Sequence, residues 1–425
     1  MTTTEDAFMS TQANPIGMAV VGLGGYGGRI IERILEAASG DDHPPRLVAV
    51  TSSNPTRHQE AVDRLEGLGV AICSTLDDLL ARDDVEAVWL PVPIELHRPF
   101  MDRTLAAGKA VMCEKPVSGS VDDCDLMIAS RNRHGLPAAI GYQSIYDPAT
   151  LALKRRILAG DLGRVISICL QGVWPRGSTY YHRAPWAGRL QSNGVWILDS
   201  AFQNAFNHFP NLGLFIAGPT PEESAVPVGV EAELYRVNEI ETYDTASIRM
   251  TLDTGATFLV LITHAAVEPR DPTITFTGER GTATWRFNGE ITFERPGSTD
   301  APMPVLDVEA QRRTMVSAFN RRVRHTPDPT RAVATLEQAR ATLVAVNGVT
   351  EAAPVHTVPA AHVRTVDGAD GSVTRTIPGI AGLFDRCAQR GQMLHEAGEA
   401  EWSVPALDKD LTGYRHFAGP HPAAD

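Results

Sequence analysis

A glycine cluster near the N-terminus constrains the fold more than any other feature of this sequence. It fits the pattern G-x-G-x-x-G between an apolar run at 18–23 and a helical stretch at 29–38, and it comprises Gly22, Gly24, Gly25, Tyr26 and Gly27. In such a strand–turn–helix unit the glycines allow a tight turn, a close approach of pyrophosphate to the backbone, and packing of helix on strand. The cluster therefore predicts a dinucleotide site; the alternative is a glycine-rich turn without a ligand.

The segments that follow alternate between apolar strands and helices. The expected strands are 18–23, 47–51, 69–73, 87–90 and 110–113, and the expected helices lie near 56–66, 75–82, 95–107 and 120–133. Continuous apolar strands separated by helices are typical of a parallel sheet covered on both faces. We therefore expect a doubly wound Rossmann domain over residues 17–145, preceded by a flexible tail, 1–16.

The pattern changes after residue 145. A helix is expected at 147–158, followed by strands at 165–174, 228–237, 246–252, 256–264, 273–278 and 281–287, and by helices at 308–324 and 329–352. Consecutive strands that alternate polar and apolar residues favour an open, mainly antiparallel sheet. The fold class is therefore α/β, with a substrate-binding α/β domain at 146–353. Residues 354–425 form a C-terminal extension, which begins as a linker and carries one helix at 379–397.

Composition excludes several function classes. The 425 residues exceed the roughly 250–300 that one core fills, and the net charge of −13 disfavours nucleic acid and anionic membrane as partners. The five cysteines include no C-x-x-C pair, which argues against a disulfide framework or a metal site and favours a cytoplasmic location. No apolar run approaches the ~20 residues of a membrane span, and the N-terminus does not resemble a secretion signal.

The end of the second strand predicts the choice of dinucleotide. A carboxylate there would accept a hydrogen bond from the ribose of NAD. This chain has Ser52 and Ser53 instead, with Arg57 close behind. Hydroxyls and an arginine suit a 2′-phosphate, so NADP is favoured and NAD is the alternative; Arg57 as a solvated helix residue is the other interpretation.

The fifth strand runs into Glu114-Lys115-Pro116. Residues at the carboxyl end of a parallel strand lie where open α/β sheets bind ligands. Lys115 can exchange protons with a substrate if burial and nearby positive charge lower its pKa.

The order of these pieces resembles the glucose–fructose oxidoreductase, inositol dehydrogenase and rhizopine-catabolism family (Gfo/Idh/MocA). The resemblance covers roughly residues 17–352 and rests on Gly22–Gly27, then Pro93 and His97, 107–109 (AGK), Glu114-Lys115-Pro116, 141–143 (GYQ), 147–148 (DP) and 162–165 (LGRV). It implies a Rossmann domain, an open-sheet domain, and hydride transfer at a sugar or polyol hydroxyl, with Lys115 at the nicotinamide. It also implies cofactor contacts from Pro91, Pro93, His97 and Glu114, and a homodimer or homotetramer formed through the open sheet face. His97 has a second interpretation, as a histidine whose hydrogen bonds are all internal.

Two departures from that family affect the site. Ile94 stands where an asparagine is usual, and Gln203 stands where a histidine usually follows an aspartate, here Asp199, by four residues. On a helix, Asp199 and Gln203 share one face, but Gln203 cannot exchange protons. A regular helix would put His208 on the opposite face, unless Pro210 breaks that helix.

The segment 174–188 mixes aromatic residues with arginine and histidine. Aromatic faces stack on the C–H surfaces of sugars, so this segment predicts a substrate pocket wall, with loop packing as the alternative. Taken with the resemblance, the expected substrate-binding residues are Tyr142, Gln143, Arg176, Tyr181, Arg183, Trp186 and Asn204.

These observations favour an NAD(P)-dependent oxidoreductase that acts on a hydroxyl or keto carbon of a carbohydrate-like substrate. Lys115 is the expected acid/base, Asp199 and Gln203 are expected to orient the substrate, and no metal is expected. Two alternatives stay open: a redox-neutral, NAD-retaining sugar lyase or glycosidase-type enzyme, and a dinucleotide-binding regulator without chemistry.

Overall fold

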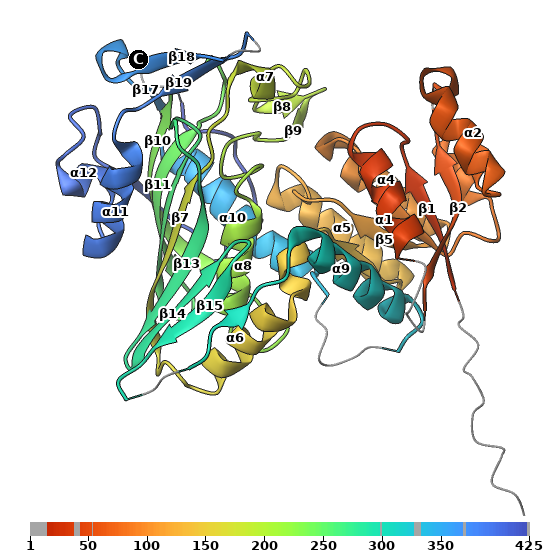
Figure 1. Ribbon diagram of the computed structural model, residues 1–425, viewed down its shortest axis with the longest axis horizontal. Helices are drawn as coiled ribbons and strands as arrows, with labels where there is room; N and C mark the ends of the chain where they lie inside the picture. The colour runs from red at the N-terminus through yellow and green to blue at the C-terminus, as the bar shows by residue number, and fades with distance from the viewer. Residues whose placement is uncertain are drawn as a thin grey trace, which may run out of the picture.

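The computed structural model describes residues 15–37, 43–52, 54–297, 300–326, 333–368 and 371–422. Within them the chain forms two large sheets that lie side by side, with helices between them, and two short hairpins (Figure 1). Most of the expected tail, and Ser53, lie outside the described residues. No helix in the described part of the chain has the length and apolarity that crossing a membrane requires.

The N-terminal sheet is parallel, with the strand order β3-β2-β1-β4-β5-β6. Its strands are β1 (Ile16–Val21), β2 (Pro45–Thr51), β3 (Ala71–Cys73), β4 (Ala87–Leu90), β5 (Ala110–Cys113) and β6 (Ala138–Ile140). The first five were predicted to within two residues at each end; β6, only three residues long, was not. The order reverses between β1 and β4, and ligands bind beyond the carboxyl ends of strands at such a point.

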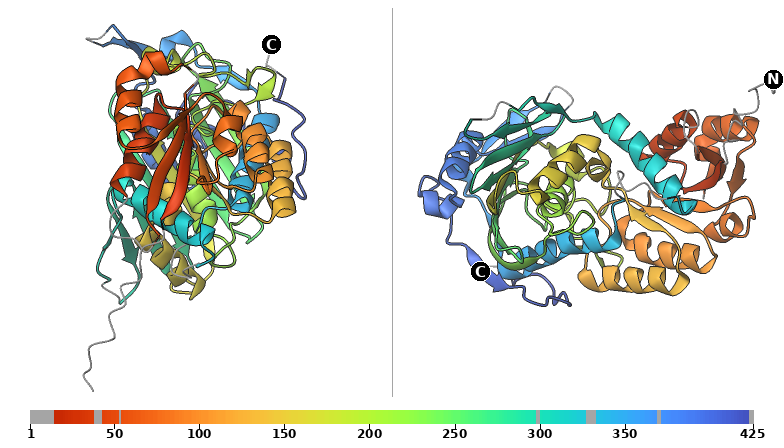
Figure 2. Two further views of the ribbon diagram at one scale, coloured as in Figure 1. Left: turned by 90° about the vertical axis from the view of Figure 1, so that its right-hand side faces the viewer. Right: turned by 90° about the horizontal axis from the view of Figure 1, so that it is seen from below.

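Helices cover both faces of this sheet (Figure 2). They are α1 (Tyr26–Glu36), η1 (Pro55–His58), α2 (Gln59–Gly67), α3 (Leu76–Leu80), α4 (Ile94–Ala106) and α5 (Val121–His134). Local chemistry fixes their ends: Ser120 caps α5 by accepting from the Asp123 N–H, and Gly135 ends that helix in the left-handed conformation.

The second sheet is mixed and mainly antiparallel, with the order β16-β15-β14-β13-β7-β12-β11-β10-β17, and β20 pairs with β10. Its strands are β7 (Val165–Val173), β10 (Pro227–Arg236), β11 (Thr245–Leu252), β12 (Thr257–Thr263), β13 (Arg270–Gly278), β14 (Gly281–Arg286), β15 (Glu290–Glu294), β16 (Met303–Pro304), β17 (Val355–Thr357) and β20 (Leu407–Asp410). A short hairpin, β8 (Gln191–Ser192) and β9 (Val195–Trp196), and the single turn α7 (Ser178–Tyr181) follow β7 along the chain.

Helices pack between the two sheets. They are α6 (Pro148–Leu158), α8 (His208–Ile216), α9 (Val308–Val323) and α10 (Leu336–Ala352), with the turn η2 (Gln143–Tyr146). The last two long helices reach back to the first sheet: α9 contacts α1, and α10 contacts both α5 and β10. An ion pair of Arg33 with Glu309 fastens α9 to α1, with an Nε–Oε2 distance of 2.7 Å.

The C-terminal extension covers part of the outer face of the second sheet. It contains β17, η3 (Ala360–His362), the hairpin β18 (Arg364–Asp367) and β19 (Val373–Thr376), then α11 (Ile380–Arg390), α12 (Leu394–Ala397) and β20. Leu383, Phe384 and Leu394 bury against Leu259 and Leu261 of β12, forming a second apolar core. The expected helix at 379–397 is interrupted at Gly391, which is left-handed (φ 64°).

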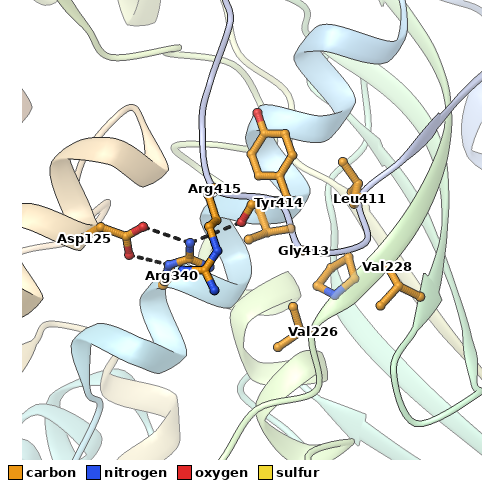
Figure 3. A pocket seen from close by; sticks show the side chains of 10 residues that line it. Asp125, Val226, Val228, Arg340, Leu411, Gly413, Tyr414 and Arg415 are labelled. Carbon is orange, nitrogen blue, oxygen red and sulfur yellow. Dashed lines mark hydrogen bonds and ion pairs between the residues drawn. The ribbon is translucent and has the colours of Figure 1, made fainter.

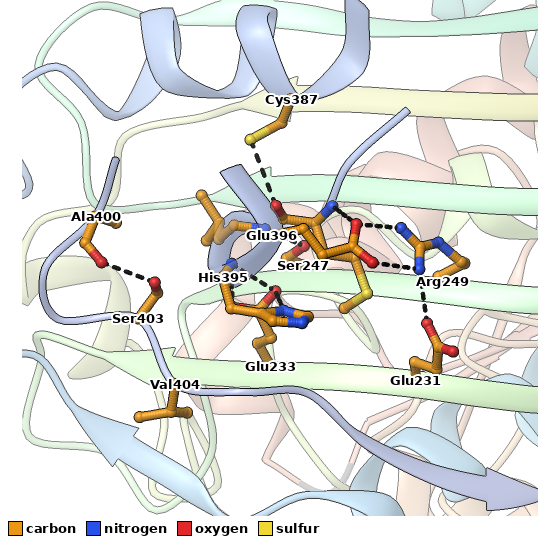
Figure 4. Close-up of polar contacts among 12 residues, drawn as sticks. Glu231, Glu233, Ser247, Arg249, Cys387, His395, Glu396, Ala400, Ser403 and Val404 are labelled. Atoms are coloured by element: carbon orange, nitrogen blue, oxygen red, sulfur yellow. Dashed lines mark hydrogen bonds and ion pairs between the residues drawn. The ribbon is translucent and has the colours of Figure 1, made fainter. Parts of the chain in front are cut away.

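Polar contacts hold this extension down (Figure 4). Glu233 of β10 is buried, and its carboxylate accepts hydrogen bonds from the backbone N–H and Nδ1 of His395 and from the Tyr235 hydroxyl. Arg249 of β11 bridges Glu231 and Glu396. The apolar part of the face expected to join subunits is therefore an intramolecular core. Thr275, Thr284 and Thr292 lie at paired positions on β13, β14 and β15, beyond this intramolecular core.

Candidate active site

The glycine cluster forms the turn between β1 and α1. The Gly22 N–H donates to the Thr51 Oγ1 at the end of β2 (2.9 Å), and a Cβ at Gly27 would lie only 2.3 Å from the Gly22 oxygen. Gly25 precedes α1 with a φ of 57°, and no side chain caps the N–H groups of the first turn. These backbone donors are therefore available to an anion, which fits the pyrophosphate of a dinucleotide.

The adenosine end of this groove carries no carboxylate among its described residues. Ser52 is buried, with its N–H bonded to the Cys73 oxygen, and Arg57 is exposed and forms no ion pair with any described residue. His58 was not predicted here, but its ring lies against Gly24, where an added Cβ would be 3.1 Å from the Nε2.

Lys115 lies at the carboxyl end of β5, beside the switch point. Its Nζ donates to the Asn204 backbone oxygen at 3.0 Å and lies 3.5 Å from the Asn204 Oδ1. Burial lowers the pKa of Lys115 to about 8, as do the charges of Arg183 and Arg312; Glu114 and Asp199 oppose this change. The lysine is therefore a group that exchanges protons near neutral pH.

The Glu114 carboxylate is bound to a side chain of β4. It is buried and accepts from the Trp89 Nε1 at 3.0 Å, and burial raises its pKa. A Cβ on Gly141 would come within 2.7 Å of this carboxylate. Glu114 acts on Lys115 through its charge and through its packing next to the lysine in the chain.

Three buried side chains fix the loop that follows Lys115. His97 lies 3.1 Å from the Val117 oxygen through its Nδ1, Gln203 donates to the Ser118 oxygen (2.8 Å), and Asn347 of α10 donates to the Gly119 oxygen (2.9 Å). The other His97 nitrogen lies 2.9 Å from the Val92 oxygen, and burial lowers the pKa of this ring. His97 therefore joins the loop after β4, which includes Pro91 and Pro93, to the loop after β5.

The expected helix carrying Asp199 and Gln203 is wrong, because residues 201–207 form turns and α8 begins at His208. Gln203 is fully buried. Its amide N–H donates to the Ser118 oxygen and its amide oxygen accepts from Asn207, so neither group is available to substrate. His208 instead lies close to Lys115: burial and then the charges of Lys115 and Arg312 hold its pKa well below the usual range. Its Nδ1 is buried without a hydrogen-bond partner among the described residues. A neutral imidazole therefore lies within electrostatic range of the lysine.

Asp199 is buried in a network of donors. Its carboxylate accepts from the Gly188 N–H (2.6 Å), the Asn204 Nδ2 (2.5 Å) and the Arg183 Nη2 (3.2 Å). Asn204 thus links Asp199 to Lys115. Because protein groups already donate hydrogen bonds to this carboxylate, it orients Arg183 and Asn204 and is not free to bind a ligand.

Two residues expected to contact substrate lie deeper. Tyr142 is buried and its hydroxyl donates to the Asn207 Oδ1 at 2.6 Å, while its ring meets the edge of His208. Gln143 is also buried, at the start of η2. Of the two, Tyr142 packs directly against His208.

Segment 174–188 brings arginines and aromatic rings together, as expected. The Arg183 guanidinium lies 3.8 Å from the centre of the Tyr180 ring and 4.6 Å from that of Trp186, and Arg176 lies 5.1 Å from Tyr180. The Tyr181 hydroxyl is buried with no hydrogen-bond partner in the described part of the chain.

Two further cations come from helices rather than from the motifs. Arg312 of α9 and Arg33 of α1 share Glu309 and lie 6.0 Å and 5.6 Å from the centre of the Tyr26 ring. Arg312 also acts on the pKa values of Glu114, Lys115 and His208, so its charge lies between the glycine turn and the lysine. No sequence motif marks it, because α9 is nearly 200 residues from Lys115 along the chain.

Of two cavities in the described part of the chain, the first lies outside this cluster and the second borders it at Tyr181 and Arg183. One, of about 500 Å³, lies between α10, β10 and residues 411–415 (Figure 3). The other, of about 690 Å³, lies between residues 181–189 and 239–241. Among the described residues no group of three or more histidine, cysteine or acidic side chains could hold a metal ion.

Known proteins resemble the two parts of the chain to different extents. Residues 16–142 match an oxidoreductase family described by an NAD-binding Rossmann fold. An inositol 2-dehydrogenase of Ralstonia nicotianae is 33% identical over 147 residues, which are 34% of this chain and 42% of the relative. A dTDP-3,4-didehydro-2,6-dideoxy-alpha-D-glucose 3-reductase of Streptomyces violaceoruber is 33% identical over 34% of this chain and 41% of its own. The matched region thus spans about two fifths of these relatives.

Solved structures extend the likeness of fold. The WlbA dehydrogenase of Bordetella pertussis, in complex with NADH and UDP-GlcNAcA, has a TM-score of 0.64 at 22% identity, covering 79% of this chain and 95% of that one. A levoglucosan dehydrogenase in complex with NADH has a TM-score of 0.66 at 15% identity, covering 79% and 96%. The Rossmann domain of this chain thus matches the Gfo/Idh/MocA oxidoreductase family over residues 16–142, and the fold of the solved structures extends over 79% of the chain.

Proposed function

We propose that the protein is an NAD(P)-dependent oxidoreductase that interconverts a hydroxyl and a keto group on a sugar, polyol or related cyclic substrate. The observation that carries this proposal is the position of Lys115, at the switch-point edge of the sheet and with a pKa of about 8. The names of the relatives, an inositol dehydrogenase and a sugar reductase, support the substrate class.

The glycine turn fits the dinucleotide. The uncapped N–H groups of α1 take its pyrophosphate, and the cations Arg33 and Arg312 lie next to that turn. When bound, the dinucleotide supplies the hydride donor or acceptor. The protein supplies orientation and the proton.

Lys115 and His208 divide the work at the hydroxyl. In the oxidation direction the neutral amine of Lys115 takes the hydroxyl proton, and in reduction the ammonium returns it. His208, kept neutral by burial, hydrogen-bonds the same oxygen and orients it. Asn204 holds Lys115 in place through its backbone oxygen.

We further propose that NADP is preferred over NAD, because Ser52 and the exposed Arg57 stand where a carboxylate would select NAD.

Replacement of Lys115 by methionine tests the function. Sugars and polyols are first screened with both dinucleotides to find a substrate. Lys115→Met keeps the length of the side chain and removes the amine, so single-turnover hydride transfer should fall by ~10²–10⁴. Dinucleotide binding should persist, because that site consists of backbone. A single-turnover rate within a few-fold of the parent would exclude Lys115 as the acid/base.

A further inference from the structure

The substrate side of the active site carries more positive charge than negative. Arg183 acts on Lys115, and Arg176 shares the Tyr180 ring with Arg183, so three cations gather here, whereas Asp199 and Glu114 are the carboxylates that act on Lys115. Burial raises the pKa of Glu114, and Asp199 is occupied by Arg183, Gly188 and Asn204. An oxidised nicotinamide would add a further positive charge, in a protein whose net charge is −13.

Arg176 in particular has no carboxylate partner. Among the described residues no Asp or Glu lies within ion-pair distance of it; its Nη1 donates to the backbone oxygen of Pro175 at 3.0 Å, and its guanidinium also interacts with the Tyr180 side chain. Its guanidinium lies over Tyr180 and near the ring of Trp174. Stacking of this kind holds the planar fork of an arginine in place and leaves its edge for a bidentate anion.

A buried polar atom next to these arginines also has no partner. His264, at the end of β12, is 1% exposed, and its Nδ1 lies 2.7 Å from the Trp174 oxygen. Its Nε2 has no hydrogen-bond partner in the described part of the chain. Burial and then the charge of Arg176 lower the pKa of His264 to about 3, so the ring is neutral. With Nδ1–H donating to Trp174, the Nε2 is an acceptor that a substrate hydroxyl can satisfy.

We propose that the substrate is an acidic sugar, whose carboxylate or phosphate binds Arg176 and Arg183 while the carbon to be oxidised or reduced lies at Lys115. This inference rests on the proposed function and narrows its substrate class. The acidic group offsets the excess charge of the pocket. A neutral polyol would leave Arg176 without an anionic partner in a partly buried site.

Matched pairs of substrates test the proposal. Initial rates are measured with saturating NADP⁺, and with NAD⁺, for D-glucuronate against D-glucose, D-galacturonate against D-galactose, and D-glucose 6-phosphate against D-glucose. We expect kcat/KM to be at least ~10-fold higher for the acidic member. The uronates and the phosphate ester separate a carboxylate site from a phosphate site. A neutral sugar used as well as its acidic counterpart would overturn the proposal.

Two variants locate the effect. Arg176→Gln should lower kcat/KM for the acidic sugar ~10–100-fold, mainly through KM, and should lower kcat/KM for the neutral sugar by a much smaller factor. Arg164→Gln is the matched control: this arginine precedes β7, whereas Arg176 follows it, and it is exposed and paired with Glu279. Arg183→Gln should act like Arg176→Gln, but it also disturbs Asp199. Equal losses on acidic and neutral sugars would contradict a charge-specific role.

Calorimetry separates this proposal from the proposed function. D-glucuronate, D-glucose 6-phosphate and D-glucose are titrated into the NADPH-loaded protein and its variants. A preference for the acidic sugars that Arg176→Gln abolishes supports the anion site even if no sugar is turned over, in which case only the oxidoreductase activity fails. Equal or absent binding of acidic and neutral sugars contradicts the anion site.

Discussion

The two halves of the active site are built from different materials. The dinucleotide side consists mainly of backbone: a glycine turn, uncapped N–H groups and a helix N-terminus, all within twelve residues of β1. The substrate side consists of charged and polar side chains from segments 115, 176–183, 199–208 and 312, which only the folded chain brings together. The backbone-built dinucleotide site should tolerate changes of side-chain charge but not added side-chain volume. The substrate site, built from side chains, should be sensitive to changes of charge and less sensitive to added volume.

An added methyl group provides the strongest contrast. Gly27→Ala would place a Cβ 2.3 Å from the Gly22 oxygen, so the turn must shift. The steric clash should cost about 1–3 kcal/mol, which should weaken dinucleotide binding by up to ~10²-fold. Fluorescence titration measures the effect. Gly28→Ala, where the nearest contact is 3.2 Å, is the milder control. Undiminished binding in Gly27→Ala would contradict the backbone-built site.

A polar substitution should affect the opposite half. His208→Gln keeps a hydrogen-bonding group but loses the imidazole, and we expect kcat/KM to fall ~10–10²-fold because the substrate oxygen is less well oriented. The dissociation constant of the dinucleotide should not change. Steady-state kinetics and a binding titration together test both statements. A loss confined to cofactor binding would show that His208 belongs to the dinucleotide site and not to the substrate site.

Proton transfer by Lys115 predicts a pH profile. With a pKa of about 8, oxidation needs the amine neutral, so kcat/KM should rise about tenfold per pH unit below 8 and level off above it. Reduction needs the ammonium and should show the reverse. Unfolding raises this pKa toward 10.5, so the unfolded state binds the proton more tightly and Lys115 destabilises the protein at neutral pH. Lys115→Met should therefore have a higher Tm than the parent, as calorimetry can check.

A substitution of Gln203 tests whether this side chain affects catalysis by holding the backbone of the loop after Lys115. Gln203→Ala leaves the Ser118 oxygen without its donor, and the loop after Lys115 should loosen. We expect kcat to fall ~3–10-fold, the cost of one lost hydrogen bond, with little change in KM. Asn347→Ala, which frees the next carbonyl, should behave alike. A rise in KM without a change in kcat would indicate instead that Gln203 binds the substrate.

The smallest expected effect lies at the adenosine end. Arg57→Ala should weaken NADPH binding ~3–10-fold, as expected for one exposed charge, and leave NADH binding unchanged. Titrations with both dinucleotides decide the matter. If the intact protein binds NADH at least as well as NADPH, the proposed preference is wrong.

The same contrast explains what the sequence could predict. The glycine turn, the first five strands and Lys115 depend on contiguous residues, and all were predicted close to their places. The position of Gln203 was misjudged because a carboxylate four residues earlier suggested a helix, whereas residues 201–207 form turns. Asn204 and His208 have the same four-residue spacing, and searching for that spacing with an amide in place of the carboxylate would have found them. Arg312 could not be found, because only tertiary packing brings α9 to the lysine.

The closure of the second sheet by β17 and β20 has a consequence for synthesis. Both strands pair with β10, so its edge and the adjoining apolar face stay uncovered until residues 355–410 have left the ribosome. A nascent chain stalled before that point displays unpaired backbone and leucine side chains, the features that chaperones bind and that lead to aggregation. The final segment of the chain thus determines when the preceding sheet can safely be released into solution.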